Sequence, residues 1–229
     1  MAVARIKGMR SLRGELLRIY GLLNDHFGDL HWWPAEGPFE VMLGAILTQN
    51  TAWTNVEKAI EGLRERGLLS PDALERIDET DLAEIIRPSG YFRVKARRIK
   101  DFLRFFRHGY AARVEAMAAE PVESLRERLL AVSGIGPETA DSILLYACGK
   151  PVFVSDAYTQ RILHRHRLIA RDAGVNEVRA LFMENLPHDV FLFNQFHALL
   201  VATGKAFCRK RPKCGECPLG ILPHRVEAQ

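Results

Sequence analysis

Apolar residues recur at the three- and four-residue spacing of an amphipathic helix along most of the chain. The spacing is clearest in seven segments, residues 12–23, 41–47, 56–63, 82–86, 99–106, 125–132 and 143–147. Alternating apolar and polar positions, which are typical of strands, are nearly absent, and glycine and proline separate the periodic segments. The pattern therefore predicts an all-α fold.

Length and composition indicate a folded globular protein. The chain has 229 residues, of which 48% are hydrophobic, and this is enough to bury a substantial core in one large domain or in two joined lobes. The early basic residues are not followed by an apolar run, and no apolar stretch approaches the length of a membrane span. We therefore expect a cytoplasmic protein with no membrane partner.

The charge distribution is more informative than the formal net charge of +4, which is compatible with nucleic-acid binding without establishing it. Basic residues gather in three clusters: Arg93, Lys95, Arg97, Arg98, Lys100, Arg104 and Arg107; then Arg161, Arg165, Arg167 and Arg171; then Lys205, Arg209, Lys210, Arg211 and Lys213. Each cluster alone fits a solvated helix face as well as a DNA contact.

Residues 129–140 predict two helices joined by a Gly-x-Gly turn. Gly134 and Gly136 can take positive φ and have no Cβ, so a phosphate can approach the amide hydrogens of the turn closely. Pro137 suits the first position of the second helix. Taken alone, the motif is more typical of an ordinary helix corner than of a phosphate site. The residues predicted to contact a phosphate are Gly134, Ile135, Gly136 and Thr139.

Five stretches in this order resemble the endonuclease III superfamily of helix-hairpin-helix DNA glycosylases. They are residues 43–51, residues 90–96, the turn at 134–136, the segment around Asp156 and the cysteine-bearing tail. The closest likeness is to the 3-methyladenine DNA glycosylase III group, through Trp32-Trp33-Pro34, residues 48–51, and Gly134-Ile135-Gly136 with a glutamate two places further on.

The resemblance implies a lobe organisation. A six-helix barrel lobe is expected over residues 30–150, ending in the hairpin, and residues 1–29 are expected to form a second lobe with residues 151–229. In the family, double-stranded DNA containing a damaged base lies across the cleft between the lobes. We expect a monomer.

Two acidic residues indicate which reaction to expect. From local sequence Asp156 predicts an N-cap, and the resemblance matches it to the aspartate that family members use in cleaving the glycosidic bond. An ionised carboxylate near C1′ can stabilise an oxocarbenium-like transition state or orient water. Glu138 stands where lyase-competent members carry the lysine that forms a Schiff base, which favours a glycosylase without AP lyase activity.

The tryptophans are the expected base pocket. The resemblance places Trp32, Trp33, Pro34 and Trp53 around a flipped base, although the Trp-Trp-Pro run also fits a loop anchor. An aromatic pocket favours a cationic 3-alkylpurine through cation-π attraction, by roughly 0.5 to 2 kcal/mol. Gln49 resembles the family residue that fills the gap in the duplex, and its alternative is a polar side chain bonded to backbone.

The tail resembles the [4Fe-4S] loop of the superfamily but lacks one ligand. Cys208, Cys214 and Cys217 have the expected spacing, whereas Pro223 occupies the fourth position and His224 follows one residue late. Three readings stay open: a [4Fe-4S] cluster on three cysteines with His224 or an exogenous ligand, zinc on the same cysteines with one histidine, or no metal.

The sequence thus predicts a monofunctional DNA glycosylase of base excision repair that acts on an alkylated purine such as 3-methyladenine. Two alternatives remain. One is a glycosylase for uracil or thymine in mismatches or for oxidised pyrimidines, and the other is a non-catalytic helix-hairpin-helix DNA-binding protein.

Overall fold

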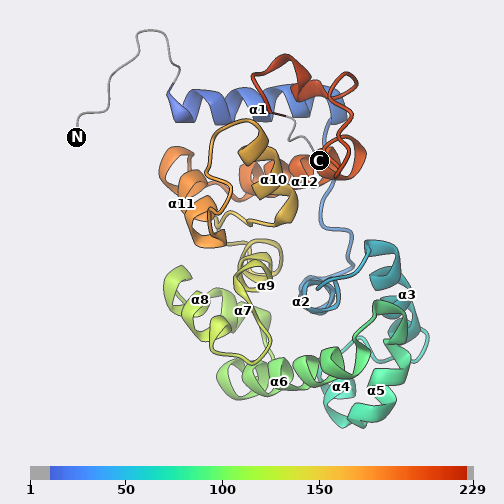
Figure 1. Cartoon of the computed structure of the whole chain (residues 1–229). Helices are drawn as coiled ribbons and strands as arrows, with labels where there is room; N and C mark the ends of the chain where they lie inside the picture. Colours follow the sequence, from blue (N-terminus) through green and yellow to red (C-terminus); the bar gives the residue numbers. More distant parts are fainter. Residues whose placement is uncertain (1–10, 226–229) are drawn as a thin grey trace. The chain divides into compact units, whose positions relative to one another are not determined.

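The computed structural model describes residues 11–225 and contains helices but no strand in that range (Figure 1), which confirms the all-α prediction. The helices are α1 (Leu12–Phe27), α2 (Pro38–Leu47), α3 (Trp53–Arg64), α4 (Pro71–Arg76), α5 (Glu79–Ile85), α6 (Phe92–Tyr110), α7 (Val114–Ala118), α8 (Val122–Leu130), α9 (Pro137–Ser142), α10 (Ala157–Arg165), α11 (Val175–Asn185) and α12 (Val190–Ala206). Short 3₁₀ helices η1 (Arg87–Ser89) and η3 (Pro218–Ile221) and a π-helical turn η2 (Ile143–Ala147) complete them. No helix within this range is long and apolar enough to cross a bilayer.

The chain divides into two compact units. One unit spans residues 33–154 and holds α2 to α9 with η1 and η2. The other combines residues 1–32 with residues 155–229 and holds α1, α10, α11, α12 and η3. The sequence placed the corresponding boundaries near residues 30 and 150.

The core of the 33–154 unit is built around α6. Its residues Ala96, Ile99, Leu103 and Phe106 recur at helical spacing and are buried, and α6 packs against α2, α4, α5 and α7. Burying one large apolar side chain contributes about 1.5–3 kcal/mol relative to exposure, so Ile99, Leu103 and Phe106 each add to the free energy that holds the unit together.

The core of the other unit is built around α12, which packs against α1 and α10 (Figure 1). Phe193 and Phe196 of α12 and Ile162 of α10 are fully buried. A Cβ at Gly204 would overlap the ring of Tyr158. The glycine therefore permits the close approach of α12 to the first turn of α10, where Asp156 is the N-cap.

Candidate functional site

The predicted hairpin is present between α8 and α9, and its first glycine requires a left-handed backbone. Gly134 has φ +81°, and a Cβ there would overlap the side chain of Arg98. Pro137 begins α9 at its first position, as the sequence predicted. Gly134 is therefore constrained both by backbone conformation and by the side chain that crosses it.

Two details of the turn differ from the sequence prediction. Gly136 does not take positive φ but is extended, with φ −91° and ψ 176°, and a Cβ there would meet nothing within 4 Å. The amide of Ile135 donates to the carbonyl of Val132 at 3.0 Å, so this amide serves the turn itself. The fold of the protein itself therefore does not require glycine at position 136, and only a bound partner such as a phosphate would.

Gln49 is bonded to the hairpin within the same unit. Its Nε2 donates to the carbonyl oxygen of Gly134 at 3.0 Å and to Oγ1 of Thr139 at 2.9 Å, and its Oε1 accepts a hydrogen bond from Arg98. In the free protein, Gln49 is thus a polar side chain bonded to the backbone, which was the alternative interpretation of this residue. Thr139, predicted to contact phosphate, is buried and accepts from Gln49 instead.

A buried ammonium group supports the loop that carries Gln49. Lys95 is 1% exposed, and its Nζ donates to the carbonyl of Leu47 at 2.9 Å and to that of Ser89 at 2.6 Å. Burial, together with the nearby charge of Arg98, lowers the pKa of Lys95 to about 8. The lysine joins the last carbonyls of α2 and η1, groups that a helix end leaves without a partner.

Asp156 is the N-cap of α10, as its local sequence predicted. Its Oδ1 accepts from the backbone amide of Thr159 at 2.7 Å, and its Oδ2 lies 3.7 Å from Nε2 of His197. Burial by itself raises the pKa of this carboxyl, but His197 and the Thr159 amide outweigh it, and the pKa ends below its ordinary value. The side chain is therefore a buried, ionised carboxylate.

The four pocket residues expected from the sequence do not belong to one unit. Trp33 and Trp53 meet edge to face with ring centroids 5.0 Å apart, and Tyr146 lies 5.2 Å from Trp33. Trp33 also packs against Gly44 of α2, which agrees with the anchoring alternative. Trp32 belongs to the other unit, where the Nζ of Lys205 lies 5.6 Å from its ring centroid.

A pocket of about 250 Å³ lies beside Trp33 and Trp53. Its lining is aromatic and acidic, and comprises Trp33, Pro34, Glu40, Gly44, Trp53, Glu57, Ile60, Glu61 and Arg64. Three carboxylates and one guanidinium leave this lining with two net negative charges. The sequence pattern pointed to the aromatic residues of this wall but not to its carboxylates, of which Glu57 and Glu61 lie one helical turn apart on α3 and Glu40 lies on α2.

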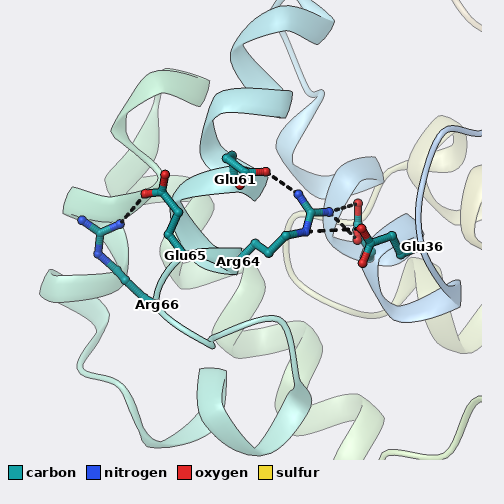
Figure 2. Close-up of polar contacts among 6 residues, drawn as sticks. Glu36, Glu61, Arg64, Glu65 and Arg66 are labelled. Atoms are coloured by element: carbon teal, nitrogen blue, oxygen red, sulfur yellow. Dashed lines mark hydrogen bonds and ion pairs between the residues drawn. The ribbon is translucent and has the colours of Figure 1, made fainter.

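Arg64 holds the acidic side of this pocket in place (Figure 2). Its guanidinium donates to Glu61 and to both carboxylate oxygens of Glu40 at 3.1 Å, and its Nε lies 3.7 Å from Glu36. The hydrogen bond to Glu61 is the largest cause of a raised pKa at Arg64. The neighbouring Glu65 pairs with Arg66 at 3.8 Å outside the pocket lining. Glu57 is exposed at the pocket.

The basic cluster on α6 is largely engaged within its own unit. Its members contact acidic side chains or carbonyls: Arg97 with Glu79, Arg98 with Gln49, Lys95 with Leu47 and Ser89, Lys100 with Leu74, Glu75 and Ile77, Arg104 with Asp101, and Arg107 with Asp72 and Glu75. Arg97 and Arg104 are nevertheless 74% and 64% exposed, and Arg104 pairs within α6 itself. The cluster thus combines exposed residues with others, such as Lys95, Lys100 and Arg107, that join α6 to neighbouring segments.

The tail cysteines line one pocket, although they do not form a metal centre as they stand. Cys208, Cys214 and Cys217 line it together with His166 and His224. Within residues 11–225, no group of three or more His, Cys, Asp or Glu side chains is arranged to hold a metal ion. With three thiols rather than four, the donor set does not fit a cysteine-held [4Fe-4S] cluster.

Protein contacts hold this loop. Arg165 Nη1 lies 3.2 Å from the Cys208 sulfur and 2.8 Å from the carbonyl of Arg209, and Arg161 donates to the carbonyl of Cys208. His224 Nδ1 lies 2.8 Å from the Leu222 carbonyl. Two members of the second basic cluster therefore serve the tail, and whether iron, zinc or neither occupies it stays a prediction.

Comparison with known proteins agrees with this arrangement. Residues 43–188 match the model of the HhH-GPD superfamily base excision DNA repair proteins. The chain is 44% identical over 92% of its length to "Putative DNA repair glycosylase MJ1434" of Methanocaldococcus jannaschii, covering 97% of that protein. It is 31% identical to endonuclease III of Thermotoga maritima, with 79% of each chain covered.

Solved structures show the same fold. The 3-methyladenine DNA glycosylase MagIII of H. pylori, bound to 1,N6-ethenoadenine, superposes with a TM-score of 0.74 at 29% identity, covering 86% of this chain and 98% of that one. A trapped endonuclease III–DNA covalent intermediate superposes with a TM-score of 0.80 at 24% identity, covering 93% and 96%.

These matches, together with the hairpin between α8 and α9, identify a DNA repair glycosylase of the helix-hairpin-helix class. The chain belongs to the HhH-GPD superfamily of base excision DNA repair proteins.

Proposed function

We propose that this protein is a monofunctional DNA glycosylase that hydrolyses the N-glycosidic bond of a cationic alkylated purine, of which 3-methyladenine is the representative. The observation that carries the proposal is the pocket that joins Trp33 and Trp53 to three carboxylates. Aromatic faces attract a cation through their quadrupole, and a net negative lining adds Coulomb attraction that a neutral normal base does not receive. The likeness to MagIII of H. pylori supports the same substrate class.

In the proposed reaction, Asp156 acts on the sugar rather than on the base. A cationic purine leaves with its bonding electrons and becomes neutral, so it needs little protonation by an acid. Positive charge then develops on the anomeric carbon, and an ionised carboxylate placed beside that carbon stabilises it. Water supplies the new C1′–O bond and gives up a proton.

The remaining residues have binding roles in this proposal. The glycine turn at 134–136 docks a backbone phosphate, with the extended Gly136 leaving open space above the turn. Gln49 leaves its bonds to Gly134 and Thr139 and fills the duplex where the nucleotide has been extruded. Trp32 lies in the unit that carries Asp156, with the Nζ of Lys205 at 5.6 Å from the centroid of its ring.

A panel of lesion-containing duplexes tests the substrate class. We expect base release from duplexes carrying 3-methyladenine or 7-methylguanine, and release at least about tenfold slower from uracil opposite guanine or thymine glycol, because only the first two bases carry the charge that the pocket attracts. Single-turnover release is the measurement. Faster release of uracil or thymine glycol supports the mismatch or oxidised-pyrimidine alternative, and binding without release from any duplex supports the non-catalytic one.

Glu57→Gln is the matched probe of the pocket charge. We expect about a threefold loss in kcat/KM for 3-methyladenine, in keeping with the modest value of an exposed charge, and no loss for the neutral lesion 1,N6-ethenoadenine. Glu65→Gln, at the C-cap of the same helix and outside the pocket lining, is the control and should change neither. Equal losses for the charged and the neutral lesion would show that Glu57 does not select by charge.

Borohydride reduction tests the absence of lyase chemistry. Glu138 is exposed at the second position of α9 and offers no amine, so no Schiff base can form at that position. We expect no covalent protein–DNA adduct with abasic-site DNA, whereas endonuclease III treated in parallel should give one. An adduct with this protein would establish a nucleophilic amine elsewhere and a bifunctional enzyme.

A further inference from the structure

A histidine faces the aspartate on which the proposed reaction depends. His197 lies in the middle of α12, and Asp156 caps α10, the helix that packs against it. His197 is 5% exposed and Asp156 is 8% exposed. The Nε2 of His197 lies 3.7 Å from Oδ2 of Asp156, within ion-pair range though longer than a direct hydrogen bond.

The two carboxylate oxygens of Asp156 have different partners. Oδ1 is held by the backbone amide of Thr159 at 2.7 Å, which is the ordinary capping bond of a helix N-terminus. Oδ2 faces the imidazole. The capping bond holds Oδ1 alone, and His197 is the charged or titratable side chain that lies near Oδ2.

Contacts of α12 with neighbouring helices hold His197 in its place opposite Asp156. Gly204, two helical turns further along α12, lets the helix touch Tyr158 of α10. Gln195, two residues before His197, donates to the side chain of Asn24 at 3.1 Å and to the carbonyl of Gly28 at 2.7 Å. These contacts fix the rotation of α12, and with it the direction in which His197 faces.

We propose that His197 is a positioning residue for glycosidic bond cleavage: it holds Asp156 ionised and in one orientation while positive charge develops on the sugar. The inference rests on the proposed function of Asp156. It assigns to α12 a role in the reaction that the hairpin and the N-cap do not supply.

The physical need for such a partner follows from burial. Removing a carboxylate from water favours its neutral form, and a neutral acid has no charge with which to stabilise an oxocarbenium-like sugar. The groups acting on the Asp156 carboxyl are His197 from α12 and Thr159 from α10, and together they lower its pKa against burial.

Removing His197 should slow base release most at low pH. With His197 present, the carboxylate stays ionised below the ordinary pKa of an aspartate. Without it, burial dominates and the pKa rises, so the carboxylate is lost at mildly acidic pH. In His197→Gln we expect single-turnover release of 3-methyladenine to fall at least about tenfold at pH 5 and less than about threefold at pH 8, because the buried carboxyl of the variant is then largely protonated at the lower pH and ionised at the higher one.

The experiment compares His197→Gln and His197→Asn with His188→Gln, a substitution of an exposed histidine in the same unit. Single-turnover rates are measured from pH 4.5 to 8.5, together with the pKa of Asp156 from carboxyl-carbon NMR. Both His197 variants should shift the acid limb of the rate profile and the Asp156 titration upward together. His188→Gln should leave both at the wild-type position.

The outcomes separate this inference from the proposed function. An unshifted acid limb and an unshifted Asp156 titration in both His197 variants overturn the role of His197, even if the wild type is an active glycosylase. If the wild type releases no base from any duplex, the proposed function fails, whereas the NMR titration still tests the pairing. Equal loss of rate at every pH in the His197 variants, without a titration shift, would mean a purely structural role and also overturn the inference.

Discussion

Replacing Asp156 by asparagine is expected to slow single-turnover release of 3-methyladenine by at least about 100-fold, the scale of losing one electrostatic stabiliser of a transition state. The helix should survive the change, because asparagine caps an N-terminus as well as aspartate does and its oxygen can still accept from Thr159. Binding to abasic-site DNA, measured by fluorescence anisotropy, should stay within about threefold of wild type, since the lost charge acts on the reacting sugar.

Asp189→Asn is the matched control for this prediction. Asp189 caps α12 through the Leu192 amide at 2.7 Å, as Asp156 caps α10 through Thr159, but it is exposed. Its asparagine variant should therefore keep the wild-type rate. A wild-type rate in Asp156→Asn as well would remove Asp156 from the mechanism.

Substituting the two glycines of the hairpin should separate folding from DNA contact. Gly134→Ala places a side chain at φ +81° and into Arg98, and such backbone strain costs about 1–3 kcal/mol. Moving Arg98 also breaks its hydrogen bond to Gln49. We expect a lower free energy of unfolding by urea together with DNA affinity reduced at least about tenfold.

Gly136→Ala is the informative counterpart. The extended backbone and the open space at this position accommodate a methyl group in the free protein, so the free energy of unfolding should stay within about 0.5 kcal/mol of wild type. DNA affinity should nevertheless fall about tenfold if a phosphate approaches the turn closely. Wild-type affinity in this variant would contradict a close phosphate contact at residue 136.

The sequence predicted what short-range physics determines. Helical spacing gave the all-α fold, Pro137 gave the start of α9, and Asp156 read correctly as an N-cap, because each depends on residues within about one helical turn. The Gly-x-Gly pattern suggested positive φ at both glycines, but only Gly134 has a left-handed backbone, whereas Gly136 is extended. A turn needs one such residue here, and the sequence does not say which.

The pairings that organise the site are long-range, and no local pattern encodes them. Gln49 reaches Thr139 across 90 positions, and Asp156 meets His197 from a different helix. The α6 cluster looked like a basic surface because the acids that pair with it, such as Glu79 and Asp72, lie on other helices. Likewise, adjacent Trp32 and Trp33 fall in different units, which a two-residue motif cannot reveal.

The bonds of Gln49 bear on how a repair enzyme searches a genome. In the free protein this side chain is already satisfied by Gly134, Thr139 and Arg98, and giving up three such bonds costs roughly 2–4 kcal/mol. A sound base pair resists opening and offers nothing to offset that cost, whereas a lesion that stacks or pairs poorly does. On the role proposed for Gln49, its side chain would stay bonded to the hairpin on intact DNA and would enter the duplex only where a lesion offsets that cost.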